Sequence, residues 1–243
     1  EIRILPLVPG RSTTATIQKM HAPQGGKLRI AVLGSGVGSN FKAIVEAIAA
    51  GKLDAEVVAA ISDQKDSGFL AIAKQAGLPA HFVDPGTNPK KLGEAAQKEI
   101  FEHLERARTD VVVLAGFMRV LTSRFLSAYP DRIVNIHPSL LPSFPGLHAQ
   151  KQAYDYGVEI AGCTVHLVEE GMDTGPVLSQ RSLVVSREDT EEMLAAKILK
   201  EEHRLLPETL ERIRQTGFTL LPRGSRRVVM RSLVNTGKRS VSL

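Results

Sequence analysis

Runs of apolar residues that suit buried strands alternate with segments of helical periodicity along most of this chain. Residues 28–33 are one such run, and residues 41–50 then place Phe41 and Ile44 at helical spacing. Strands joined by helices of this length form a mostly parallel, twisted sheet with helices on both faces, so the sequence predicts an α/β fold. The other predicted strands are 56–61, 80–83, 111–114, 132–136, 163–168 and 177–185, and the other predicted helices are 68–76, 90–108 and one from about 190 past 203. Pro207 should bend or restart this last helix.

The positive charge of the chain is concentrated at its ends. The 243 residues carry a net charge of +5, a balance that by itself is typical of nucleic-acid-binding proteins. Residues 219–243 hold six basic residues and no acidic one, whereas residues 27–218 hold 22 basic and 25 acidic residues, a net charge of −3. We therefore predict one domain over 27–218, with an N-terminal extension over 1–26 and a basic C-terminal tail over 219–243, and no nucleic-acid partner. Residues 227–231 alternate enough for a short edge strand.

The cysteine and histidine content bears on the cellular compartment of the protein and on whether it binds a metal. The single cysteine, Cys163, cannot form an internal disulfide, which favours a reducing, cytoplasmic compartment. The histidines have no metal-ligand spacing, so we predict no metal site. No apolar run approaches the roughly 18 residues of a membrane span, and we expect no membrane association.

A glycine-rich segment, GSGVGSN at residues 34–40, follows the first predicted strand and opens the first predicted helix. Glycines allow the backbone to turn tightly, and the free N–H groups of a helix N-terminus suit a phosphate. The spacing is not that of the dinucleotide fingerprint, and the segment lacks the lysine of a P-loop. Phosphate binding is the favoured interpretation. A dinucleotide site that uses Asp63 and a structural turn in which Ser39 caps the helix are the alternatives.

Three polar residues suit acyl transfer. Asn135 and His137 alternate with the apolar Ile136 at a predicted strand end, so they share one face of the strand, and a proline-rich loop follows them. The amide N–H of an asparagine can stabilise an oxyanion, and an imidazole can move a proton near neutral pH. Asp173 lies in a glycine-rich loop, from which a carboxylate could favour the charged form of His137. A structural histidine and a turn-forming aspartate are the alternatives.

These segments together resemble the folate-dependent formyltransferases. The resemblance is carried by NIHPSLLP at 135–142, FPGLH at 144–148 and DTGP at 173–176. LAGFMRVL at 114–121 and GSN at 38–40 are similar to the branch of the family that acts on glycinamide ribonucleotide in purine synthesis. The likeness extends from about residue 28 to residue 211. It implies a Rossmann-like fold with antiparallel strands toward the C-terminal end.

The resemblance also implies a reaction and its residues. A formyl group would pass from 10-formyltetrahydrofolate, a co-substrate, to the amine of glycinamide ribonucleotide in a monomeric or homodimeric enzyme. In the family a basic residue upstream of the long helix usually helps to bind the folate, and the resemblance implies Lys90 or Lys91 as the candidates for it here. The implied sites are Asn135, His137 and Asp173 for catalysis; Gly38, Ser39, Asn40 and Glu202 for the nucleotide; and Met118, Arg119, Val120, Leu121, Asn135, Glu169, Glu170, Gly171, Met172 and Asp173 for the folate.

The sequence by itself leaves several other functions open. A formyltetrahydrofolate hydrolase is expected to carry an N-terminal regulatory domain, for which residues 1–26 are few. A methionyl-tRNA formyltransferase is expected to carry a further C-terminal domain, where this chain has a short tail. A nicotinamide-dependent oxidoreductase is disfavoured by the glycine spacing. A non-catalytic nucleotide-binding module would not need Asn135, His137 and Asp173 together.

Overall fold

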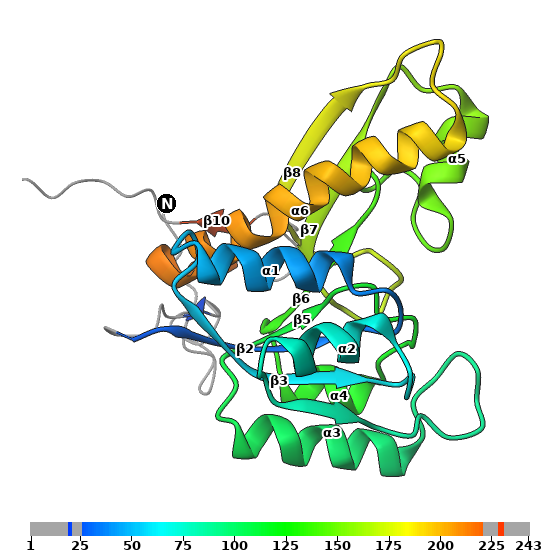
Figure 1. Cartoon of the computed structure of the whole chain (residues 1–243). Coiled ribbons are helices and arrows are strands. Elements are labelled where there is room, and N and C mark those ends of the chain that lie inside the picture. The colour runs from blue at the N-terminus through cyan, green and yellow to red at the C-terminus, as the bar shows by residue number, and fades with distance from the viewer. Residues whose placement is uncertain (1–18, 21–25, 221–227, 231–243) are drawn as a thin grey trace, which may run out of the picture.

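A seven-stranded sheet forms the centre of the molecule (Figure 1). It is seen in a computed structural model that describes residues 19–20, 26–220 and 228–230. The strand order is β4-β3-β2-β5-β6-β7-β8; the strands from β4 to β6 are parallel, and β7 and β8 are antiparallel to their neighbours. The predicted α/β fold with antiparallel C-terminal strands is therefore confirmed. The strands are β2 (Leu28–Leu33), β3 (Ala55–Ser62), β4 (Ala80–Phe82), β5 (Val111–Leu114), β6 (Ile133–His137), β7 (Ile160–Leu167) and β8 (Val177–Val184).

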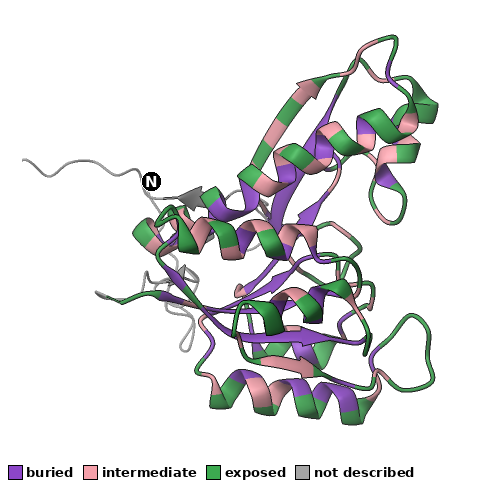
Figure 2. Cartoon of the chain, in the orientation of Figure 1, coloured by how far each residue is buried: buried purple, intermediate pink, exposed green. Residues whose placement is uncertain are grey.

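Helices cover both faces of this sheet, and each face has its own apolar core (Figure 2). Along β2, Ile30 and Val32 face one core while Ala31 and Leu33 face the other, because successive side chains of a strand point to opposite sides. Helices α1 (Ser39–Ala49), α2 (Gly68–Gln75) and α6 (Glu191–Thr216) pack on the first core, α3 (Glu94–Arg106) and α4 (Ser123–Ala128) pack on the second, and α5 (Ala149–Tyr156) precedes β7.

Helix α3 begins four residues later than predicted. The Asn88 Oδ1 atom accepts hydrogen bonds from the backbone N–H groups of Lys90 and Lys91 at 2.8 and 3.0 Å. Lys91 then pairs with Val120 in an isolated parallel bridge. Charged residues before Glu94 thus belong to a loop held by tertiary contacts, which their composition does not reveal.

Helix α6 continues through Pro207, so the predicted restart is wrong, whereas the alternative of a bend at Pro207 stays a prediction. Proline removes one helical hydrogen bond, but Leu205, Leu206 and Leu210 around it are buried against the first core. Packing of this face keeps the helix in one piece. The short helices α4 and α5 were not predicted because neither gives an apolar stripe long enough to be recognised.

A second, three-stranded antiparallel sheet has the order β1-β9-β10. Its strands are β1 (Lys19–Met20), β9 (Phe218–Leu220) and β10 (Val228–Met230), so the short edge strand expected at 227–231 is confirmed. Most of the predicted extension over 1–26 and tail over 219–243 lies outside the described residues, and the division of the chain at 27 and 218 stays a prediction. No helix in the described part of the chain is long and apolar enough to cross a membrane.

Candidate functional site

The register of β6 and β7 puts four polar side chains on one face of the sheet. Asn135 pairs with His166, and His137 pairs with Thr164. Directly opposed residues of an antiparallel pair lie on the same face, so these side chains are neighbours. Ile136 belongs to the core on the other face, as the alternation of the sequence predicts.

The loop between β7 and β8 brings Asp173 to His137. Asp173 Oδ2 lies 3.3 Å from His137 Nδ1 and accepts a hydrogen bond from the Gly146 backbone N–H at 2.7 Å. Both side chains are largely buried, with 6% of His137 and 13% of Asp173 exposed. Gly175 permits this path, because a Cβ at that position would lie 1.8 Å from the Leu167 carbonyl oxygen. The sequence therefore needs glycine in the DTGP segment for a steric reason.

A buried histidine that the sequence analysis did not single out, His166, completes the cluster. Its Nδ1 atom lies 2.8 Å from the Leu167 carbonyl oxygen, which can only accept, so the proton of the neutral ring is on Nδ1. Its Nε2 atom then accepts a hydrogen bond from Asn135 Nδ2 at 3.1 Å and lies 3.6 Å from Asp173 Oδ1. Burial, aided by the nearby His137, lowers the pKa of His166 and favours this neutral ring.

His166 thus fixes the orientation of the Asn135 amide. One amide N–H is used on His166 Nε2, and the other remains to donate elsewhere. The only sequence signal for His166 is its place on a strand, and that signal becomes useful once the β6–β7 register is known.

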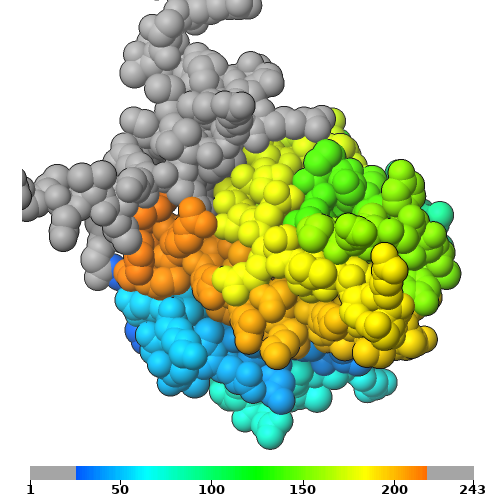
Figure 3. Space-filling view, turned by 90° about the horizontal axis from the view of Figure 1, so that it is seen from above, coloured from blue at the N-terminus to red at the C-terminus, as the bar shows by residue number. Residues whose placement is uncertain are grey.

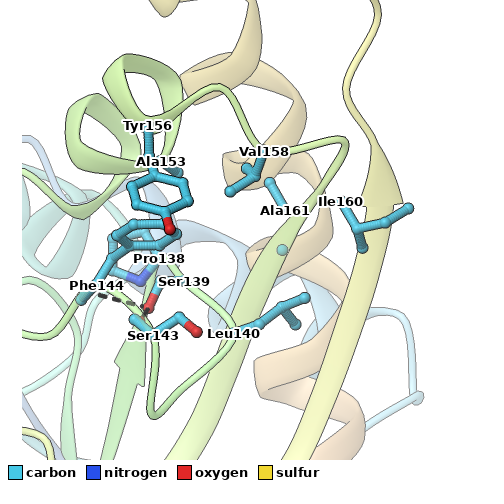
Figure 4. Close-up of a pocket in the computed structure, with 11 residues that line it drawn as sticks. Pro138, Ser139, Leu140, Ser143, Phe144, Ala153, Tyr156, Val158, Ile160 and Ala161 are labelled. Carbon is cyan, nitrogen blue, oxygen red and sulfur yellow. Dashed lines mark hydrogen bonds between the residues drawn. The ribbon is translucent and has the colours of Figure 1, made fainter.

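The proline-rich loop after β6 supports the other nitrogen of His137. His137 Nε2 donates to the Phe144 carbonyl at 2.9 Å, and Ser139 Oγ donates to the Ser143 carbonyl at 2.6 Å. Thr164 Oγ1 donates to the Ser139 carbonyl and accepts from the Leu141 N–H, which ties the loop to β7. A cavity of about 370 Å³ lies between this loop, α5 and the start of β7 (Figure 4).

The glycine-rich segment ends at an uncapped helix N-terminus. Gly38 is the N-cap of α1 at φ 80°, and no side chain caps the first turn, which also contains no acidic residue. Ser39 lies inside the helix, so the alternative in which Ser39 caps it is wrong. A Cβ on Gly38 would lie 2.7 Å from the Phe69 Cα, and glycine is the residue suited to this left-handed backbone. The free N–H groups can donate hydrogen bonds to an anion.

Asn40 and Glu202, which are 162 positions apart, meet beside this helix N-terminus. Asn40 Nδ2 donates to Glu202 Oε2 at 2.7 Å. Burial raises the pKa of Glu202 to about 7, although the hydrogen bond from Asn40 lowers it. Helices α1 and α6 lie side by side (Figure 3), and a groove of about 600 Å³ between them starts at Ser39.

The residues predicted to bind the folate lie in two segments that flank β6. Met118 to Leu121 follow β5 and Glu169 to Asp173 follow β7, and β5 and β7 are the neighbours of β6 in the sheet. Met118, Val120 and Met172 are exposed apolar side chains, whereas Leu121 is buried. Glu169, Glu170 and Gly171 also line a depression of about 410 Å³ beside α4. Exposed apolar groups on both sides of β6 suit a flat ring.

The structure thus gathers the predicted residues into three groups. His137 and Asp173 are in direct contact, and His166 joins Asp173 to Asn135. Asn40 contacts Glu202, and the two folate segments flank the strand of the first group. Lys90 and Lys91 are exposed in the loop before α3. Within the described residues, no three His, Cys, Asp or Glu side chains are grouped so that they could hold a metal ion.

The amino-acid sequence matches the family described as formyl transferase over residues 28–210. A phosphoribosylglycinamide formyltransferase of Escherichia coli (strain K12) is 40% identical over 180 residues, which is 74% of this chain and 84% of that protein. A trifunctional purine biosynthetic protein adenosine-3 of Drosophila melanogaster is 41% identical over 201 residues; the match includes 82% of this chain but 15% of that much longer protein. The crystal structure of glycinamide ribonucleotide transformylase 1 from Symbiobacterium toebii is similar with a TM-score of 0.80 and 42% identity, over 86% of this chain and 96% of that one.

Proposed function

The chain belongs to the formyl transferase family, and we propose that it transfers the formyl group of 10-formyltetrahydrofolate to the amine of glycinamide ribonucleotide in de novo purine synthesis. The products are formylglycinamide ribonucleotide and tetrahydrofolate. The observation that carries this proposal is the contact of His137 with Asp173 at the end of β6, together with the contacts by which His166 joins Asp173 to Asn135. Acyl transfer needs a donor that stabilises an oxyanion and a group that transfers a proton, and an amide beside an imidazole–carboxylate pair supplies both.

The reaction begins when the unprotonated amine of the nucleotide attacks the formyl carbon on N10 of the folate. The C=O bond opens to a tetrahedral intermediate whose oxygen carries the negative charge. The Asn135 N–H that is not used on His166 donates to this oxygen. His166 keeps that N–H in place before the substrate arrives, so no reorganisation is required during the reaction.

His137 and Asp173 serve the proton transfer. The attacking nitrogen must lose a proton, and N10 must gain one before the bond between carbon and N10 breaks. A protonated His137 would pair with the Asp173 carboxylate 3.3 Å from its Nδ1. The Gly146 N–H holds the same carboxylate oxygen, which orients it toward the ring.

The nucleotide and folate halves of the site follow from the other two groups of residues. Gly38, Ser39 and Asn40 present the N-terminus of α1 to the phosphate, and Glu202 accepts hydrogen bonds from the ribose hydroxyls. Met118 to Leu121 and Glu169 to Asp173 hold the folate ring. We further propose that the protein acts in the cytoplasm as a monomer or homodimer on these small molecules, without a metal, a membrane or a nucleic acid.

A deformylation assay tests the function. The purified protein is mixed with 10-formyltetrahydrofolate, and release of tetrahydrofolate is followed with and without glycinamide ribonucleotide. Turnover that requires the nucleotide supports the proposal. Turnover without it would indicate a hydrolase, and no turnover would favour a binding module.

Two variants test the assigned residues. Asn135→Ala should lower kcat by roughly 10²–10³, the loss expected for one oxyanion donor. His137→Ala should lower kcat by at least roughly 10², the contribution of general acid–base catalysis. Near-full activity of either folded variant would contradict the site.

A further inference from the structure

A polar network outside the Asn135–His137–Asp173 cluster connects the loops after β3, β4 and β5. Asp63 follows β3, and its Oδ2 atom accepts a hydrogen bond from Arg119 Nε at 2.7 Å. Arg119 follows β5 and also donates from Nη1 to the Asn88 carbonyl, which lies in the loop after β4, at 2.6 Å. One guanidinium group therefore joins three loops at the carboxyl ends of parallel strands, where ligands of such sheets bind.

The ion pair at the centre of this network is buried. The exposed fractions of the Arg119 and Asp63 side chains are 11% and 2%. Burial by itself raises the pKa of Asp63, but the hydrogen bonds from Ser35, Arg119 and Gln64 outweigh it, so the pKa is lowered and the carboxyl is charged. A buried ion pair contributes little net stability but holds its partners in one geometry, since losing either partner leaves a buried charge.

The ion pair between Arg119 and Asp63 helps to fix the position of a loop beside the residues proposed to bind the folate. The Val120 N–H donates to the Lys90 carbonyl at 2.8 Å, next to the bridge between Lys91 and Val120. Together with the bond from Arg119 to Asn88, this contact presses the loop 84–93 against Met118 to Leu121. Lys90 and Lys91 are exposed on that loop. The loop thus offers two ammonium groups next to the segment that is proposed to hold the folate.

We propose that Asp63 is a positioning residue for the anionic end of the formyl donor. It acts through Arg119, which holds the loop 84–93 so that Lys90 and Lys91 face the glutamate carboxylates of the folate. This inference rests on the proposed formyl transfer. It also argues against the dinucleotide interpretation of Asp63, because the Oδ2 atom of its carboxylate is used by the Arg119 guanidinium.

The test compares KM values for the two substrates. Asp63→Asn removes the charge but keeps the shape, and Asp66→Asn makes the same change at an exposed position of the same β3–α2 loop. A second donor, 10-formyltetrahydropteroate, lacks the glutamate and reports whether the effect depends on the carboxylates. The double variant Lys90→Gln/Lys91→Gln removes the ammonium groups themselves.

Wild-type turnover is measured first, so that a failure of the proposed function is recognised separately. Asp63→Asn should then raise the KM for 10-formyltetrahydrofolate about tenfold, the value of one or two exposed ion pairs. Its kcat and its KM for glycinamide ribonucleotide should stay within about twofold of the wild type. The lysine double variant should show the same increase, and Asp66→Asn should show none. With the glutamate-free donor, Asp63→Asn and the wild type should be alike.

The inference is overturned if the KM values of Asp63→Asn match those of Asp66→Asn. It is also overturned if Asp63→Asn raises KM equally for both formyl donors, or equally for the donor and the nucleotide, as a general loss of structure would do. If Asp63→Asn does not fold, Arg119→Lys carries the test. A lysine keeps the charge beside Asp63 but cannot reach both acceptors of the planar guanidinium. The same selective increase in KM is then expected, and its absence overturns the inference.

Discussion

Replacing Glu202 with glutamine should change how the stability of the protein depends on pH. Burial raises the pKa of Glu202 from 4.5 to about 7. At about 1.4 kcal/mol per unit, this difference corresponds to roughly 3 kcal/mol. Between pH 4.5 and 7 the folded protein keeps a proton that the unfolded chain has lost, so this carboxyl lowers the free energy of unfolding as the pH rises.

Glutamine does not titrate but can accept the same hydrogen bond from Asn40. The free energy of unfolding of Glu202→Gln, minus that of the wild type, should therefore grow between pH 5 and pH 8 by roughly 3 kcal/mol. Urea denaturation at four pH values in this range measures the difference. Glu102→Gln, on an exposed face of α3, is the matched control and should show no such growth. A constant difference between Glu202→Gln and the wild type would refute the argument.

Three further predictions concern the catalytic loop and a second titrating group. Asp173→Asn should lower kcat more than it raises the KM for either substrate, because its carboxylate pairs with His137 during the reaction. Steady-state kinetics in which both substrates are varied measures the two effects, and a change in KM alone would contradict the prediction. Gly175→Ala should lower kcat, since its Cβ would meet the Leu167 carbonyl 1.8 Å away and displace the loop that carries Asp173; unchanged kinetics would show that the loop tolerates the shift. Burial, followed by the charge of His103, lowers the pKa of His81 below its ordinary 6.5, although Glu99 opposes this shift. The unfolded chain therefore takes up a proton at a higher pH than the folded protein does, and the free energy of unfolding decreases as the pH falls below 6.5. His81→Asn should thus lose less stability than the wild type between pH 7.5 and 5 in urea denaturation, while His148→Asn, at an exposed position, should behave like the wild type.

The architecture was largely predictable because the strands of a doubly covered sheet are apolar and short. The run at 111–114 is buried on both faces and coincides with β5. Where tertiary contacts replaced a local pattern, the prediction was wrong. The start of α3 depends on Asn88 and Val120, and the continuity of α6 across Pro207 depends on packing against the sheet.

In the candidate site, too, some features could be predicted from the sequence alone. The alternation of Asn135, Ile136 and His137 determined by itself which side chains share a face, because the period of a strand is two residues. The three-glycine loop likewise indicated an open helix N-terminus, which the structure has at Gly38. These features depend on neighbours in the chain and can be read without the fold.

The partners of these residues were decided by the tertiary structure. His166 reaches Asn135 through the β6–β7 register, Glu202 reaches Asn40 from the last helix, and Arg119 is held by Asp63 from another strand end. Each pair is brought together by sheet order and helix packing, which place residues far apart in the chain within hydrogen-bond distance. The sequence determined which chemical groups this protein carries and on which face they lie. Only the folded structure decided which donor meets which acceptor, because those contacts depend on register and burial and not on local pattern.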